Sequence, residues 1–196
     1  NKRFYIQGNA RTNFSGGSFN GEIYYFQGFG GGSLSSISGG EFSLTGTLRA
    51  QGNGQVSITG GVFNDDAGGE LWVTSSSSME IRGGSFNLPI QVQQDGQLSI
   101  FGHPAFNYPF GSYEDGSDLD GATLTGRLFS GDTFSSTIAI DEDGFDAVAK
   151  VTLVNLINPD LAPPAAATPV PTSPIWLLGI MAGLLSLVGF RKLRKA

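Results

Sequence analysis

The sequence has no cysteine and a single histidine among its 196 residues. The first absence excludes disulfides and thiolate metal sites, and the second leaves a histidine zinc centre or a Ser/His/Asp triad without independent support. The fold must therefore be held by backbone pairing and packing alone, which is compatible with export. His103 stands next to Pro104 where related stretches have glycine, so we expect a corner residue there and not a catalytic base.

Basic residues are scarce outside the C-terminal tail. The residues before position 170 hold seven lysines and arginines against seventeen acidic residues, a net charge of −10. No basic patch is present that displaces counterions from phosphate, so no nucleic-acid partner is expected. An acidic surface suits solubility outside the cell and weak cation binding.

Long apolar runs are absent except for one, the uncharged stretch 175–190. It follows the proline-rich segment 169–174 and precedes four cations, Arg191, Lys192, Arg194 and Lys195. A helix of this length rises about 24 Å against a hydrocarbon core of about 30 Å, so the pattern predicts a short membrane-spanning helix with a cytoplasmic basic end. A buried C-terminal helix of a soluble domain is the alternative.

The order of motif, apolar helix and basic end resembles the PEP-CTERM family of bacterial sorting signals. In place of Pro-Glu-Pro, the motif here is a Val-Pro-Thr-like variant formed by Val170, Pro171, Thr172, Ser173 and Pro174. The resemblance implies an exosortase-like membrane enzyme as a partner, which cuts near the motif and passes the protein to the envelope or extracellular matrix. Because the chain begins with Asn1 and shows no secretion signal, we also expect a lost leader and upstream residues.

The segment ahead of the tail contains an internal repeat with the pattern apolar, any, Gly, Gly, any, Phe. Four copies occupy 13–20, 36–43, 57–64 and 80–87, and a degenerate fifth copy is predicted at 100–106. The aligned phenylalanines recur at nearly constant intervals: Phe19, Phe42, Phe63, Phe86 and Phe106. A period of about 22 residues predicts stacked coils.

Apolar residues alternate with other residues on both sides of the Gly-Gly pairs, as in Val56-x-Ile58 and Leu71-x-Val73. Period two is typical of strands. The pattern favours an all-β fold, a right-handed parallel β-solenoid with coils of about 22 residues, over a β-sandwich or a loose β-meander. The Ile-Ser-Gly-Gly-x-Phe repeats also resemble β-helix modules of exported bacterial proteins. A third possibility is that the repeats form no stable fold without upstream coils.

The predicted organisation has five parts. A solenoid needs a cap, because its open end exposes unpaired backbone. The parts are β-solenoid repeats over 1–110, C-terminal cap strands over 111–157, a Pro/Ala-rich linker with the sorting motif over 158–174, the transmembrane helix over 175–190 and the basic cytoplasmic tail over 191–196.

The repeats offer few residues for catalysis. Sugar-cleaving enzymes need carboxylates that face each other at about 5 to 10 Å, whereas Asp65-Asp66 is the one acidic pair in the first four repeats. Neighbours on a strand point to opposite faces, so we interpret the pair as a solvated turn and expect no enzymatic activity. Trp72 and the run Tyr24, Tyr25 and Phe26 offer rings for sugar stacking, although half-exposed strands are the simpler explanation.

No cofactor is expected, with calcium as the alternative. Two acidic, glycine-containing loops supply its candidate ligands, and neither matches an EF-hand: Asp115, Asp118, Asp120, Asp141, Asp143 and Asp146. The sequence as a whole predicts an exported structural or adhesive protein of the cell surface or extracellular matrix. A polysaccharide-binding or polysaccharide-degrading β-helix is the alternative function.

Overall fold

The computed structural model describes residues 3–7, 9–28, 32–65, 68–141 and 148–156, with side chains from 9 to 20 and from 32 onward. This part of the chain consists of strands joined by turns and loops. The strands are β1 (Arg3–Gln7), β2 (Arg11–Gly28), β3 (Leu34–Leu44), β4 (Thr47–Gly52), β5 (Gln55–Asp65), β6 (Glu70–Thr74), β7 (Ser78–Asn87), β8 (Ile90–Gln93), β9 (Gln97–Gly102), β10 (Gly111–Tyr113), β11 (Thr123–Arg127), β12 (Thr133–Asp141) and β13 (Lys150–Asn155).

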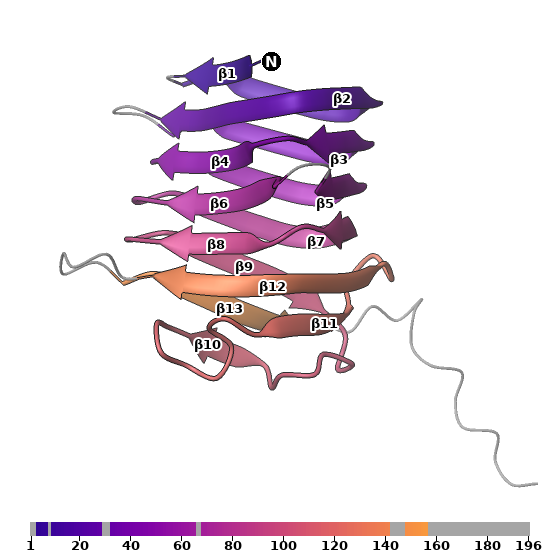
Figure 1. Ribbon diagram of the computed structural model, residues 1–196, viewed down its shortest axis with the longest axis vertical. Helices are drawn as coiled ribbons and strands as arrows, with labels where there is room; N and C mark the ends of the chain where they lie inside the picture. The colour runs from indigo at the N-terminus through magenta and orange to yellow at the C-terminus, as the bar shows by residue number, and fades with distance from the viewer. Residues whose placement is uncertain (1–2, 8, 29–31, 66–67, 142–147, 157–196) are drawn as a thin grey trace, which may run out of the picture. The chain divides into compact units, whose positions relative to one another are not determined.

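The strands form a parallel β-solenoid, so the predicted all-β stacked-coil architecture is confirmed (Figure 1). One side of the stack runs through β2, β3, β5, β7, β9 and β13, and the other through β1, the end of β2, β4, β6, β8 and β12. In the first side, Arg11 pairs with Leu34, Leu34 with Gln55, Gln55 with Ser78 and Ser78 with Gln97. The strand pairing thus repeats at nearly the same interval as the Gly-Gly-x-Phe pattern of the sequence.

The core consists of columns in which one coil places the same kind of side chain on the next. Ile37, Ile58, Ile81 and Ile100 form one fully buried column. Phe42, Phe63 and Phe86 form another, in which neighbouring rings lie nearly parallel with centroids 4.8 Å apart. Each fully buried Ile or Phe contributes about 2 kcal/mol of burial free energy, and no single coil buries its own column.

The Gly-Gly pairs allow two coils to approach closely. A Cβ placed on Gly60 would lie 2.6 Å from the carbonyl oxygen of Ser38 in the preceding coil. The second glycine of that pair, Gly61, has a φ of +110°, a conformation that disfavours any side chain. The first glycine is thus required by packing between coils, and the second by backbone conformation.

The predicted fifth copy of the repeat is wrong at its phenylalanine. The position below Phe86 is filled by Phe134, which pairs with it across β7 and β12 at a centroid distance of 5.5 Å. Phe106 instead packs edge-on against Phe134, at 6.2 Å. The chain leaves the stack after Gly102, and residues 103–132 lie outside it. β12 then returns to the stack by pairing with β8.

That excursion supplies the cap. β10 lies antiparallel to β13, and β11 lies antiparallel to β12, so both strands close the last coil from outside (Figure 1). The predicted cap region 111–157 therefore contains two kinds of strand. β10 and β11 cover the end, whereas β12 and β13 continue the solenoid by parallel pairing with β8 and β9.

The predicted linker, membrane helix and basic tail lie outside the described residues. Among the residues that are described, none belongs to a helix with the length and apolar character needed to cross a membrane.

Candidate functional site

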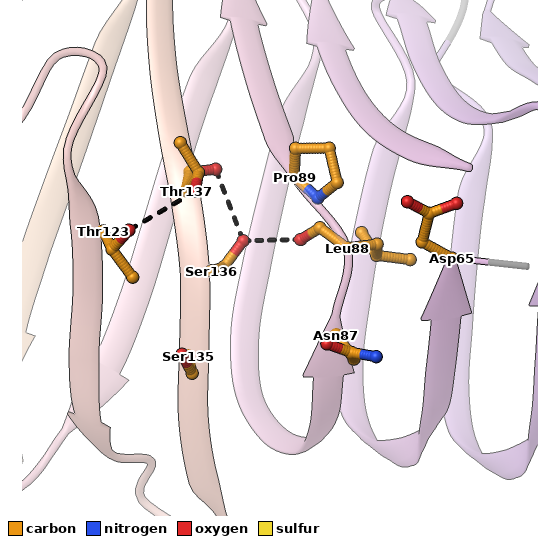
Figure 2. A pocket seen from close by; sticks show the side chains of 8 residues that line it. All are labelled: Asp65, Asn87, Leu88, Pro89, Thr123, Ser135, Ser136 and Thr137. Carbon is orange, nitrogen blue, oxygen red and sulfur yellow. Dashed lines mark hydrogen bonds between the residues drawn. The ribbon is translucent and has the colours of Figure 1, made fainter. Parts of the chain in front are cut away.

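An open groove of about 270 Å³ lies where the last coils meet the cap (Figure 2). Asp65 ends β5, Asn87 ends β7, Leu88 and Pro89 form the corner between β7 and β8, and the remaining residues come from β11 and β12. The full lining is Asp65, Asn87, Leu88, Pro89, Thr123, Ser135, Ser136 and Thr137.

The alternation of β12 explains how its side chains reach the groove. Phe134, Ser136 and Ile138 point inward and are buried, so Ser135 and Thr137 point outward. The buried hydroxyl of Ser136 donates to the carbonyl oxygen of Leu88 at 2.7 Å, which ties β12 to the β7–β8 corner (Figure 2). The β12 wall of the groove is therefore anchored to the β7–β8 corner.

The groove surface carries hydroxyl and amide groups and one carboxylate. The Asp65 Oδ1 accepts hydrogen bonds from the backbone N–H groups of Gly68 at 2.6 Å and Gly69 at 2.7 Å. The interpretation of Asp65 as a turn residue is confirmed, whereas Asp66 lies outside the described residues. Glycoside hydrolysis needs two facing carboxyl groups, and this lining offers Asp65 alone. Its chemistry suits hydrogen bonding to a neutral, hydroxyl-rich ligand.

The candidate calcium ligands are divided between two loops. The Asp120 Oδ1 accepts a hydrogen bond from the backbone N–H of Ile140 at 2.8 Å. Asp115, Asp118 and Asp141 lie toward the surface. No group of three or more metal-binding side chains comes together in the part of the chain that the structure describes, and Asp143 and Asp146 lie outside it.

Tyr113 in β10 lies near these acidic residues, and the pKa of its phenol is raised. Burial raises the pKa of its phenol above the ordinary value of 10.0, and the negative charge of Asp118 and the neighbouring Tyr108 raise it further. The hydroxyl donates to the carbonyl oxygen of Pro109 at 2.6 Å, which also favours the neutral form.

Trp72, the aromatic residue on the outer surface of β6, contacts side chains of its own and the preceding coil. The indole Nε1 of Trp72 donates to the Glu70 carboxylate at 2.5 Å, and the guanidinium of Arg49 lies 5.1 Å from the ring centroid. Trp72 is half-buried, as expected for an outward residue of a strand. The side chains of Tyr24, Tyr25 and Phe26 are outside the described set.

His103 is a buried residue at the point where the chain leaves the stack. Its backbone N–H donates to the Arg127 carbonyl at 3.0 Å, and its carbonyl accepts from the Ala105 N–H at 2.6 Å. The expectation that His103 is a corner residue and not a catalytic base stays a prediction.

The sorting-motif residues and the basic residues of the tail lie outside the described residues: Val170, Pro171, Thr172, Ser173, Pro174, Arg191, Lys192, Arg194 and Lys195.

Sequence reasoning missed the groove, because its walls come from segments as distant along the chain as Asp65 and Thr137. A usable signal existed. The pattern Phe86-x-Leu88-x-Ile90 returns much later in the sequence as Phe134-x-Ser136-x-Ile138. This recurrence would have placed β12 beside β7 and β8.

The fold places the chain in the structural class of parallel β-solenoids. Comparisons with protein-family models, curated proteins and solved structures found no match.

Proposed function

We propose that the protein is an exported, non-enzymatic structural or adhesive component of the cell surface or extracellular matrix, delivered by its C-terminal tail. The observation that carries this proposal is the order of the tail: motif 170–174, apolar stretch 175–190 and basic end 191–196. The proposal includes a membrane helix at 175–190, an exosortase-like processing enzyme and the envelope or extracellular space as the destination.

The solenoid supports a structural role through its outer surface. One outward row repeats as small or neutral polar residues along the stack, namely Ser43, Asn64 and Asn87. Such rows give an elongated, hydrated scaffold whose rigidity comes from its buried columns. A right-handed winding of the coils belongs to the same proposal.

The test is intact-mass analysis of the protein exported by a native-type host that has the sorting enzyme. The wild type should lose its apolar tail by cleavage near residues 169–174, and deletion of 169–174 should abolish the cleavage. A matched control deletes 163–168, a linker segment of equal length, and should still be cut. An uncut wild-type chain in the membrane fraction would contradict the sorting proposal.

Polysaccharide binding is a second candidate, favoured by the groove. Its neutral hydroxyl and amide lining matches a sugar chain, and its single carboxylate suits binding better than cleavage. Ser135→Tyr should fill the groove and abolish co-sedimentation with the extracellular polysaccharide of the host. The control Ser112→Tyr, on the exposed face of β10, should leave co-sedimentation unchanged. Equal binding by the wild type and Ser135→Tyr would exclude the groove as a sugar site.

A further inference from the structure

The corner between β4 and β5 has an asparagine followed by a glycine, Asn53-Gly54. The next two coils have Ser76-Ser77 and Asp95-Gly96 at the corresponding corners, as the pairing of the strands that follow them shows. The 196 residues contain one other such dipeptide, Asn20-Gly21. Asparagine is a thermolabile residue, and a following glycine leaves the backbone nitrogen unhindered and the main chain free to rotate. The two dipeptides are therefore the places in this chain most open to cyclisation of an asparagine side chain.

The groups that would react at the β4–β5 corner are held only weakly. Asn53 is exposed, and its carboxamide forms no hydrogen bond with the rest of the described residues. The backbone N–H of Gly54 donates to the Gln51 carbonyl oxygen at 3.3 Å, whereas the corresponding bond from Gly96 to Gln93 is 3.0 Å long. Gly54 is itself buried, but its nitrogen has only to meet the adjacent side chain. The corner thus presents a free carboxamide beside a loosely held backbone nitrogen.

Two other sites in the fold lack this combination. Asn20-Gly21 lies inside β2, where both residues pair with β3. A paired strand resists the rotation that brings a side-chain carbon onto the next backbone nitrogen. Asp95 is exposed and precedes a glycine, but its Oδ1 accepts a hydrogen bond from the Val148 N–H at 3.2 Å, and a carboxylate is a weaker electrophile than a carboxamide. Asn53 is therefore the residue at which the fold favours the reaction.

We propose that Asn53-Gly54 is a site of spontaneous deamidation through a cyclic imide. The backbone nitrogen of Gly54 attacks Cγ of Asn53 and releases its proton; the new C–N bond forms, the Cγ–Nδ2 bond breaks, and the amide group takes up the proton and leaves as ammonia. Water then adds to the imide. Opening at the side-chain carbonyl restores the original main chain and gives aspartate, whereas opening at the backbone carbonyl gives isoaspartate. The reaction consumes only water, so it does not depend on the proposed function.

The two products differ in their effect on the stack. Aspartate adds one negative charge and keeps the main chain, as Asp95 does two coils further on. Isoaspartate adds a methylene to the main chain next to two hydrogen bonds between coils. The Ser78 N–H donates to the Gly54 carbonyl at 2.9 Å, and the Gln55 N–H donates to the Ser33 carbonyl at 2.8 Å. These bonds must shift to fit the longer main chain, so the isoaspartyl form should be less stable.

The test incubates the full chain in mild detergent at mildly alkaline pH and follows its tryptic peptides by mass spectrometry. Cleavage after arginine separates the two dipeptides into peptides 12–49 and 50–82. Asn53 should gain about 1 Da well before Asn20 does, whereas in urea the two residues should react at similar rates. Asn53→Gln is the control. It should remove the gain from peptide 50–82 and leave the melting temperature unchanged, because a glutamine side chain forms its larger, six-membered imide more slowly.

Two results would overturn the proposal. A gain at Asn20 as fast as that at Asn53 in the folded chain would show that the corner does not favour the reaction. No gain at Asn53 in the folded chain, with a gain at both residues in urea, would show that the packing of Gly54 prevents it. The isoaspartyl form should also melt below Asn53→Asp, which carries the same charge on an unaltered main chain; equal melting temperatures would contradict the effect on the stack.

Discussion

Replacing Gly60 by alanine tests whether coil stacking, and not local backbone preference, determines the glycine pattern. Gly60 has an ordinary φ, so alanine is acceptable to the backbone itself. The added Cβ, however, would lie 2.6 Å from the Ser38 carbonyl oxygen, a contact that requires β5 to move away from β3. The movement would weaken the ladder between the two strands.

The magnitude follows from two opposing terms. Overpacking of a tight interior contact costs about 1 to 3 kcal/mol, and the lower entropy of the unfolded alanine variant offsets about 0.4 to 1 kcal/mol. We expect Gly60→Ala to lower the free energy of unfolding by about 1 to 2 kcal/mol, which corresponds to a fall of about 2 to 8 °C in the melting temperature for a domain of this size.

Thermal unfolding followed by far-ultraviolet circular dichroism, with urea unfolding as a second measure, provides the assay. Gly16→Ala is the matched comparison, because the same change there meets nothing within 4 Å. It should be neutral or raise the melting temperature slightly. If both variants melted at the same temperature, the close approach of coils at Gly60 would be refuted.

Three further predictions concern the core, a turn and the cap. Phe63→Ala should lower the free energy of unfolding, measured with urea, by about 3 to 5 kcal/mol, because Phe63 is fully buried between Phe42 and Phe86. Phe106→Ala should lower it clearly less, because Phe106 is partly exposed. Equal losses in the two variants would place Phe106 within the stack. Gly52 has a left-handed φ of +65°, and the residues aligned with it in the next coils, Ser75 and Gln94, have φ values of 56° and 54°. Gly52→Ala should therefore lower the free energy of unfolding by about 1 to 2 kcal/mol, and Gly52→Asn by less, in the same unfolding curves. The raised pKa of Tyr113 means that the folded state holds the phenolic proton more tightly than the unfolded state. Its contribution to stability is therefore fully present below about pH 10 and is lost as the pH rises through the folded-state pKa; ultraviolet titration should show a late-ionising tyrosine that Tyr113→Phe removes, and an unchanged titration would contradict the assignment.

The repeated part of the fold could be predicted from the sequence because its signals are local and physical. The Gly-Gly pairs and the alternation around Ile58 and Phe63 set both the coil length and the inward face. The last coil could not be predicted from such local signals. Residues 103–132 interrupt the stack, so the spacing of the repeat predicts Phe106 beside Phe86, whereas the structure places Phe134 there.

The candidate site was less predictable for a related reason. The groove depends on the hairpin of β11 and β12 folding back beside β7 and β8. The recurrence that marks this pairing, Phe86-x-Leu88-x-Ile90 and Phe134-x-Ser136-x-Ile138, joins segments far apart in the sequence and lacks the Gly-Gly pair of the other coils. Asp65 was interpreted correctly because a turn aspartate followed by glycine satisfies its hydrogen bonds locally. Composition makes Asp120 a candidate calcium ligand, but it does not reveal that the Asp120 carboxylate accepts a hydrogen bond from the Ile140 N–H.

β12 continues the parallel stack, and both the groove and the capped end depend on this arrangement. The absence of cysteine allows a direct test by pairwise cross-linking. Asn87→Cys combined with Ser135→Cys places the two thiols on neighbouring strands, one position beyond the Phe86–Phe134 pair. Mild oxidation should give an intramolecular disulfide, seen as a loss of two hydrogens in the intact mass, whereas Asn87→Cys combined with Asn107→Cys should stay reduced. A disulfide in the second pair and none in the first would show that Phe106 follows Phe86 in the stack and would contradict the account.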